Sequence, residues 1–468
     1  MVTSRSSRAT RGTVSALALV VASAFLTIAP PAAAFCGFYV GKADAKLFNE
    51  ASQVILVRDG NRTVISMRND FQGDLSEFAL VVPVPAVLQK SQIHVGDPKI
   101  FDRIDAYSAP RLAEYFDPNP CEVDKVTRQS GALNAAAPVA RMEMKKSRDD
   151  ALGVTVEARY TIGEYDIAIL SATESNGLEK WLRQSGYNIP AKASRALQPY
   201  IRQNLKFFVA KVNLAEQAKT GFSYLRPLQF AFESPRFMLP VRLGMLNARG
   251  PQDLVIYALS RNGRVEATNY RTVKLPSNVD LPTYTRGEFA QVYKALFDAQ
   301  SRREDYRVVW TEYFWDMAWC DPCAANPLSA DELRSAGVVW LDGDEPPIGV
   351  APGAAPPARS RGGGGAQPVM LTRLHLRYTP ETLPEDLIFQ ETQDKQNFQA
   401  RYVLHHPWKG DPNACAEARS YFEALGKRHE TEAQALASLT GWDINAVRAR
   451  MDLQPVAPRA AWWDRLWK

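Results

Sequence analysis

The sequence predicts an α+β protein with two mainly antiparallel sheet regions, an inserted helical hairpin and a C-terminal helical segment. Alternating apolar and polar residues, with Asp-Gly and Asn-Gly turns between them, predict strands in two separate parts of the chain. Apolar residues at helical spacing predict helices between these parts and again near the C-terminus. Because 468 residues exceed what one hydrophobic core usually supports, we expect more than one domain.

The segment 1–34 has the composition of a secretory signal peptide. Arg5, Arg8 and Arg11 form a basic start, residues 14–29 are apolar and uncharged, and prolines and alanines follow. This order is typical of exported proteins, so we expect cleavage after Ala34. The alternative is an uncleaved membrane anchor, because the uncharged stretch continues past the cleavage site.

The charge balance of the mature chain argues against a nucleic-acid partner. Without residues 1–34, which hold three arginines and no acidic residue, 53 basic and 51 acidic residues remain, a net charge of +2. Nucleic-acid binding needs a concentrated positive surface. No other uncharged apolar run reaches membrane-spanning length. We therefore expect an exported, soluble protein in the periplasm or outside the cell.

Residues 35–215 are predicted to form an N-terminal α+β domain. Residues 54–57 and 63–67 are apolar and rich in β-branched side chains, and Asp59-Gly60 between them is typical of a hairpin turn. Residues 78–84 are apolar throughout, which predicts a third strand that is buried on both faces.

Helices are predicted later in this first domain. Residues 111–121 are expected to hold a short helix that ends at two prolines. After a half-buried strand at 154–162, apolar residues at helical spacing predict two helices around Leu178 and Leu197. A strand at 206–212 follows, so the two helices form a hairpin inserted between strands.

Residues 216–408 are predicted to form a second, β-rich domain. Residues 254–259 and 265–273 flank Asn262-Gly263, which predicts another hairpin. Apolar residues at helical spacing predict a helix at 289–297.

A glycine- and proline-rich stretch interrupts this second domain. Residues 342–368 carry almost no large apolar side chain, so we expect a flexible loop. A strand at 307–313 precedes it, and alternating patterns at 373–378 and 398–404 predict strands after it. The loop is therefore an insertion in the domain.

Residues 409–468 are predicted to form a C-terminal helical segment. Three helices are expected: 412–425 ended by Gly426, 430–439 ended by a second glycine, and one capped by Asp443.

Three tryptophans, Trp462, Trp463 and Trp467, lie near the C-terminus beside basic residues. Tryptophan favours the membrane interface, so weak contact with a membrane surface is one expectation. Packing of this tail against the body of the protein is the other.

Export implies that the cysteines pair where geometry allows. The sequence has five: Cys36, Cys121, Cys320, Cys323 and Cys415. We expect disulfides Cys320–Cys323 and Cys36–Cys121, with Cys415 left free. Only the first of these pairings has its spacing in support.

Cys320 and Cys323 form a Cys-x-x-Cys pair, for which two main interpretations stay open. A structural disulfide is favoured, because exported cysteines are mostly structural. The capping box Ser329-x-x-Glu332 also starts a helix after the cysteines rather than at them. The alternative is dithiol redox chemistry, in which a helix N-terminus would stabilise the Cys320 thiolate.

Other chemistry has weaker support. A zinc site needs four ligands, and only His405-His406 offers partners to the two cysteines. Glu312, Asp316 and Asp321 could form a small acidic site, but a solvated loop is the preferred interpretation. No serine-hydrolase elbow, His-Glu-x-x-His motif or phosphate-binding glycine loop is found in the sequence. We therefore expect no metal and no cofactor.

Several phrases of the sequence resemble one protein family, the bacterial domain-of-unknown-function family 2330 (DUF2330). The resemblance covers roughly Cys36 to Leu404. It implies an exported bacterial protein without an assigned activity, and it carries over no catalytic residue. The matching phrases are Cys36–Val40, Asn49–Asp59, Phe78–Pro85, Ala109–Arg111, Asp117–Cys121, Gly177–Leu178, Trp181–Leu182, Gly186–Pro190, Trp319–Cys323 and Pro327–Ser329.

These observations favour a non-enzymatic binding or envelope-structural module over an enzyme. Its partner would be a protein or another envelope ligand. The competing function is a thiol-disulfide oxidoreductase that uses Cys320 and Cys323. Redox reactivity of that pair distinguishes the two.

Overall fold

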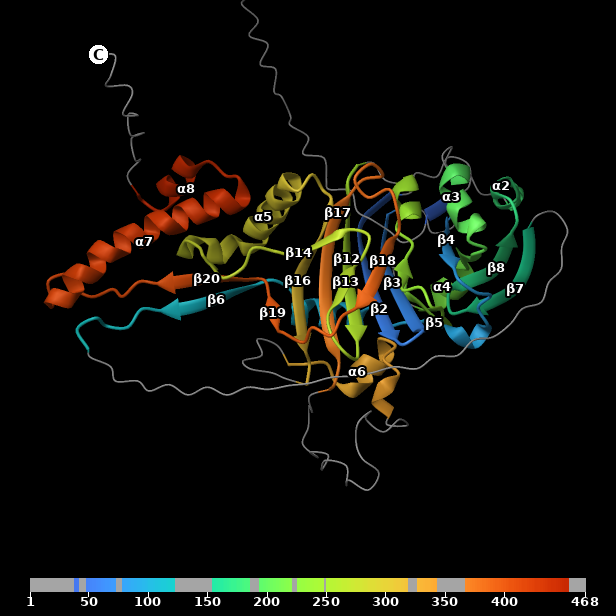
Figure 1. Cartoon of the computed structure of the whole chain (residues 1–468), viewed down its shortest axis with the longest axis horizontal. Helices are drawn as coiled ribbons and strands as arrows, with labels where there is room; N and C mark the ends of the chain where they lie inside the picture. Colours follow the sequence, from blue (N-terminus) through green and yellow to red (C-terminus); the bar gives the residue numbers. More distant parts are fainter. Residues whose placement is uncertain are drawn as a thin grey trace, which may run out of the picture. The chain divides into compact units, whose positions relative to one another are not determined.

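The computed structural model describes residues 38–41, 48–72, 78–122, 154–185, 193–220, 225–247, 250–318, 326–342 and 367–453 (Figure 1). All of them belong to one compact unit, Pro31–Lys468. The α+β class is confirmed, because helices and several mostly antiparallel sheets share this unit. None of the described helices is long and apolar enough to cross a membrane.

A nine-stranded sheet runs through the centre of this unit. Most neighbouring strands are antiparallel, but β12 pairs with β2, and β14 with β16, in parallel. In order across the sheet the strands are β14 (Arg271–Lys274), β16 (Val308–Asp316), β17 (Met370–Tyr378), β12 (Gln252–Ser260), β2 (Phe48–Asp59), β3 (Arg62–Gln72), β10 (Leu228–Glu233) and β5 (Ile93–Val95), with β19 (Phe398–Gln399) beside β16.

A five-stranded antiparallel sheet packs against one face of the nine-stranded sheet. Residues Leu80, Ile167 and Phe208 of the smaller sheet share a core with Val54 and Leu374 of the larger one. In order, the strands of the smaller sheet are β1 (Phe38–Gly41), β4 (Phe78–Val84), β9 (Lys206–Val212), β8 (Tyr165–Ala172) and β7 (Val154–Ile162).

Helices cover the outer faces of both sheets. The expected helical hairpin, α2 (Ser175–Gln184) and α3 (Ala193–Arg202), packs on the five-stranded sheet. On the nine-stranded sheet, α1 (Lys99–Ser108) and α6 (Ala330–Ser335) cover one part of the outer face, and α5 (Phe289–Arg303) covers another. Since successive strand residues point to opposite faces and both faces are covered, the middle of β2, Val54–Val57, is apolar at every position.

The remaining elements form two small sheets, several short helical turns and the C-terminal helices. Two three-stranded sheets occur, β11-β18-β13 and β15-β20-β6, and the second is parallel throughout. Helix α7 packs on α5 and α8. Their bounds are β6 (Arg111–Phe116), β11 (Met238–Leu239), β13 (Val265–Ala267), β15 (Val279–Asp280), β18 (Leu387–Glu391), β20 (Arg401–His406), α4 (Leu214–Thr220), α7 (Ala416–Thr440), α8 (Ile444–Arg450), and the 3₁₀ turns η2 (Lys90–Gln92), η3 (Arg242–Asn247), η4 (Thr283–Glu288) and η5 (Trp340–Asp342).

The expected boundary at residue 215 does not separate two domains. Strands β2 and β3 come from the expected first domain, yet they lie between β12 and β10 of the expected second domain. Strand β2 pairs with β12 along eight residues, from Asp253–Ala51 to Ser260–Arg58. One shared sheet therefore joins residues 35–215 and 216–408.

The expected hairpin around Asn262-Gly263 is wrong. Strand β12 pairs with β2 and β17, whereas β13 pairs with β18 in another sheet. A Cβ atom on Gly263 would lie 2.4 Å from the carbonyl oxygen of Thr392, so the turn packs closely on a distant segment. Strand β12 therefore pairs with the distant strands β2 and β17 rather than with β13, which the turn motif predicts as its partner.

The expected helix at 111–121 is also wrong, because Arg111–Phe116 forms strand β6. Its backbone pairs in parallel with β20, and the Arg111 N–H donates to the Ala400 carbonyl at 3.0 Å. A local sequence pattern cannot predict pairing between strands that lie nearly 300 residues apart.

Gly426 does not end a helix, since α7 continues through it to Thr440. A glycine inside a helix costs about 1 kcal/mol. Tyr421 and Arg428, on either side of Gly426, both bind the Asp117 carboxylate, at 2.6 and 2.7 Å. These contacts hold the helix together. Gly441 does end it, in the left-handed conformation (φ +74°).

Candidate functional site

The structure places only some of the residues expected at functional sites. Cys36, Cys320, Cys323, the cleavage site Ala34 and the tryptophans of the tail lie outside the described residues. The loop at 342–368 also lies outside them, apart from its ends. The Cys320–Cys323 disulfide and its redox alternative therefore stay predictions.

The expected pairing Cys36–Cys121 is wrong, and Cys415 is not free. Cys121 and Cys415 form a disulfide between residues 294 positions apart, with Cα atoms 6.0 Å apart. The parallel pairing of β6 and β20 brings the carboxyl ends of both strands together. Cys121 lies just after β6, and Cys415 caps helix α7 just after β20. Only the sheet pairing reveals this proximity.

A group of buried charges lies on the outer face of the nine-stranded sheet, between α1 and α5. Glu312 is fully buried. Arg373 Nε donates to its Oε2 at 2.6 Å, and His375 Nδ1 lies 2.6 Å from its Oε1. The Tyr293 hydroxyl also donates to Glu312. We call Glu312, Arg373, His375 and Tyr293 the Glu312 cluster.

The Glu312 cluster is tied to α1 through Asp105. Arg373 Nη1 donates to Asp105 Oδ1 at 2.6 Å, and the Tyr257 hydroxyl donates to the same atom at 2.6 Å. The Phe297 ring stacks on the His375 ring with centroids 3.7 Å apart. The cluster thus fixes two helices to three strands.

Burial alone would raise the pKa of the Glu312 carboxyl. The electrostatic effects of His375 and Arg373 outweigh it, together with the hydrogen bonds that His375 and Tyr293 make to the carboxylate, and hold the pKa at about 2. Glu312 is therefore ionised at any physiological pH. The expectation of a solvated acidic loop is wrong for this residue.

The Glu312–His375 pair resembles the carboxylate–imidazole pairs that orient a catalytic base. Such a base needs a nucleophile or substrate within hydrogen-bond reach. No described serine, threonine or cysteine is bonded to His375, and Phe297 covers one face of its ring. The contacts of the cluster form an ion-pair network that joins α1 and α5 to the nine-stranded sheet. One sequence signal could have indicated it: basic residues at 373, 375 and 377 alternate with leucines on a strand.

His405 and His406 are the last residues of strand β20, and their described contacts are with β6 and its neighbours rather than with a metal-binding group. His406 Nε2 lies 2.7 Å from a Glu114 carboxylate oxygen, and the His405 ring stacks on Tyr115. Within the ranges that the structure describes, no group of three or more histidine, cysteine or acidic side chains has metal-binding geometry.

A second charged group joins α7 to the parallel sheet. Asp117 accepts hydrogen bonds from Arg428 and Tyr421, and its carboxylate lies 3.8 Å from His405 Nδ1. Glu432, one turn after Arg428, is only 2% exposed. Arg428 Nε lies 3.5 Å from Glu432 Oε1, but neither atom has a hydrogen-bond partner among the described residues.

Burial raises the pKa of the Glu432 carboxyl from 4.5 to about 7; Arg428 opposes this shift, and the negative charges of Asp280 and Asp117 add to it. A carboxyl whose pKa is raised by folding stabilises the fold fully below pH 4.5 and loses that contribution as the pH rises through 7. We expect Glu432→Gln to raise the free energy of unfolding by about 1–3 kcal/mol at pH 8, but hardly at pH 4.5. Urea denaturation at both pH values measures this.

The control for Glu432 is Glu423→Gln, which changes an exposed carboxyl on the same helix. It should leave stability unchanged at both pH values. A Glu432→Gln effect of equal size at pH 4.5 and pH 8 would show that packing, not ionisation, is responsible.

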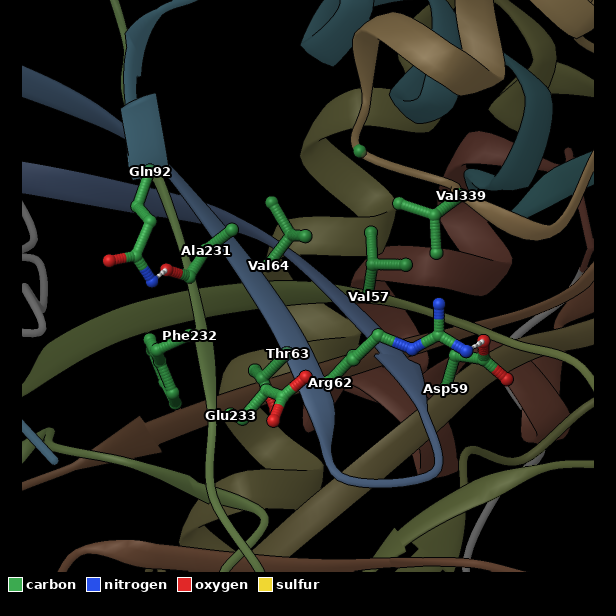
Figure 2. Close-up of a pocket in the computed structure, with 11 residues that line it drawn as sticks. Val57, Asp59, Arg62, Thr63, Val64, Gln92, Ala231, Phe232, Glu233 and Val339 are labelled. Carbon is green, nitrogen blue, oxygen red and sulfur yellow. Dashed lines mark hydrogen bonds and ion pairs between the residues drawn. The ribbon is translucent and has the colours of Figure 1, made fainter. Parts of the chain in front are cut away.

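A small open pocket lies beside the β2–β3 hairpin (Figure 2). Its volume is about 210 Å³. Most of its lining surface is apolar, although five of the eleven lining residues are polar or charged, and Arg62 and Asp59 form an ion pair there at 3.2 Å. The residues that line it are Val57, Asp59, Arg62, Thr63, Val64, Gln92, Ala231, Phe232, Glu233, Gly337 and Val339.

The turn after α6 forms one wall of this pocket. The capping box predicted from the sequence is confirmed: Ser329 Oγ accepts from the Glu332 N–H, and Glu332 bonds back to the Ser329 N–H. Gly337 ends the turn with φ +102°, and a Cβ atom there would lie 2.7 Å from a Val64 methyl group. Only glycine fits this conformation and spacing.

The fold and these features define an α+β protein that has internally paired buried charges and an open apolar pocket. The chain belongs to the family DUF2330, described as "Uncharacterized protein conserved in bacteria", whose model matches residues 30–390. No curated protein and no solved structure matches this chain. The resemblance expected from the sequence phrases is thus confirmed.

Proposed function

We propose that this protein is an exported, non-enzymatic binding module of the bacterial envelope, and that its ligand places an apolar group in the pocket of Figure 2. The composition of the pocket carries this proposal. Its lining holds no histidine, cysteine, serine or lysine, and the hydroxyl of its one threonine, Thr63, accepts a hydrogen bond from Arg58 at 2.7 Å. Apart from the exposed Glu233 carboxylate at its mouth, the lining offers no free nucleophile or base, so the site is suited to binding rather than to catalysis.

Two observations support export. The disulfide Cys121–Cys415 belongs to an oxidising compartment, since thiols stay reduced in the cytoplasm. The segment 1–34 has the composition of a signal peptide. Contact of Trp462, Trp463 and Trp467 with a membrane surface would hold the exported protein weakly at the envelope.

Export predicts that the protein in envelope fractions starts at Phe35 and carries the oxidised Cys121–Cys415 bond. N-terminal sequencing and peptide mapping without reduction measure both. A first residue upstream of position 29, or a reduced Cys121 in fresh extracts, would contradict export with cleavage.

The pocket predicts weak, saturable binding of a single aromatic group. We expect 5-fluoroindole, followed by fluorine NMR, to bind with a dissociation constant of about 1 mM, as its size allows. Val339→Trp should weaken this binding at least tenfold, because the new ring would occupy the pocket.

The matched control for Val339→Trp is Ile388→Trp on β18. Val339 is 45% exposed and Ile388 is 43% exposed, so both variants should fold. Ile388 does not line the pocket. Unchanged 5-fluoroindole binding to Val339→Trp, or no binding to the unmodified protein, would refute the pocket as a binding site.

A further inference from the structure

One edge of the nine-stranded sheet is open next to the pocket. Strand β5 pairs with β10 only from Leu228 to Phe230. The last part of β10, Ala231–Glu233, extends beyond β5 while it stays paired with β3 on its other side. These three residues also line the pocket.

The hydrogen bonds show which backbone groups face this edge. On the edge side, the Pro227 carbonyl accepts from the Gly96 N–H at 2.8 Å, and the Ala231 carbonyl accepts from the Gln92 side chain at 2.9 Å. On the β3 side, the Ser234 N–H donates to the Asn61 carbonyl at 2.9 Å. Because these directions alternate along an antiparallel strand, the N–H and carbonyl of Glu233 point to the open edge.

A side chain already occupies part of this edge. The Gln92 amide bonds to Ala231 where the next strand would place a backbone N–H (Figure 2). The edge therefore already binds an amide donor. An extended peptide adds to an edge through the same kind of bond, and its alternate side chains enter neighbouring pockets.

The size and charge of the pocket narrow the choice of peptide. Small-molecule sites usually measure about 300–1,000 Å³, so 210 Å³ suits one side chain of a longer ligand. The Asp59 carboxylate is shared by Arg62 and Arg261, each at 3.2 Å. Glu233, at the mouth, is exposed and forms no ion pair with another described residue. A positively charged group of the ligand, next to the apolar group that enters the pocket, would therefore form an ion pair with the Glu233 carboxylate.

We propose that the ligand is an extended peptide segment of a partner protein, which adds as a strand to the free edge of β10 at Glu233. One large apolar side chain enters the pocket, and a neighbouring lysine or arginine pairs with the Glu233 carboxylate. This inference rests on the proposed binding of an apolar group in the pocket.

Fluorescein-labelled pentapeptides test the proposal by fluorescence polarisation. The probe is Thr-Lys-Phe-Lys-Thr, compared with Thr-Lys-Ala-Lys-Thr and with two versions N-methylated on alternate residues. We expect at least tenfold tighter binding with phenylalanine than with alanine. Since only one set of alternate N–H groups can face β10, one N-methylated version should lose at least tenfold and the other should bind normally.

Variants at Glu233 distinguish the contribution of its backbone N–H to peptide binding from that of its carboxylate. Glu233→Pro removes an N–H that faces solvent, so β10 keeps its bonds to β3, and peptide binding should fall at least tenfold. Glu233→Gln keeps the N–H and should cost less, with a weaker dependence on salt. Equal binding of both N-methylated peptides, or full binding to Glu233→Pro, would overturn strand addition.

The 5-fluoroindole measurement keeps this inference separate from the proposed function. If 5-fluoroindole binds and the pentapeptides do not, the pocket takes an apolar ligand and the peptide proposal is wrong. If neither binds, both proposals fail. Binding of 5-fluoroindole to Glu233→Pro shows that this variant is folded.

Discussion

Replacing Arg373 by methionine is expected to lower the free energy of unfolding by about 3–5 kcal/mol, as when one partner of a buried ion pair is removed. Arg373 is 7% exposed and bonds to both Glu312 and Asp105. Without its charge, the fully buried Glu312 carboxylate would keep only its contacts with His375 and Tyr293. Urea denaturation of the oxidised protein measures the change.

The control for Arg373 is Arg271→Met. Arg271 pairs with Glu304, but its side chain is 61% exposed. Exposed ion pairs contribute about 0–1 kcal/mol, so stability should hardly change. In the double variant Glu312→Gln/Arg373→Met, part of the loss should be recovered, because no unpaired carboxylate remains. A loss below 1 kcal/mol for Arg373→Met alone would mean that water reaches the Glu312 cluster.

The same cluster predicts an acid dependence. Burial raises the pKa of the Glu312 carboxyl, but His375 and Arg373 lower it by more, so that it falls from 4.5 to about 2. A lowered pKa gives stability that is complete above pH 4.5 and is lost as the pH falls through 2. Glu312→Gln should therefore flatten the loss of stability in this acidic range. The raised pKa of Glu432 has the opposite effect: its contribution to stability is lost as the pH rises between 4.5 and 7.

Replacing Cys121 and Cys415 together by serine is expected to cost about 4–5 kcal/mol, near the upper end for disulfides, because the bond closes a very long loop. The loss follows from the greater freedom of the unfolded chain. Thermal or urea unfolding of the double variant and of the reduced parent protein, each compared with the oxidised parent, measures it. Both should show the same loss.

Cys36→Ser is the control for the disulfide. It should leave the Cys121–Cys415 bond intact in peptide maps and leave the unfolding free energy unchanged. A Cys36–Cys121 bond in the parent protein would contradict the pairing seen in the structure.

Much of the local structure is determined by the sequence alone. The hairpin at Asp59-Gly60, with Gly60 at φ +57°, and the capping box at Ser329 and Glu332 are both confirmed. So are helices α2, α3 and α5 and the strands around Val54, Val156 and Leu374. These features depend on residues a few positions apart, and side-chain periodicity and turn chemistry act over that range.

The tertiary structure decided which segments become partners. Strand β12 joins β2 and β17 instead of its own neighbour, Arg111–Phe116 becomes a strand beside β20, and Cys121 therefore meets Cys415. The burial of Glu312, the continuity of α7 through Gly426 and the pocket beside Gly337 depend on the same long-range pairing. Local patterns set the period of an element. Its neighbours are selected by the free energy of burying its faces against distant segments. A short stretch of sequence holds no information about those segments.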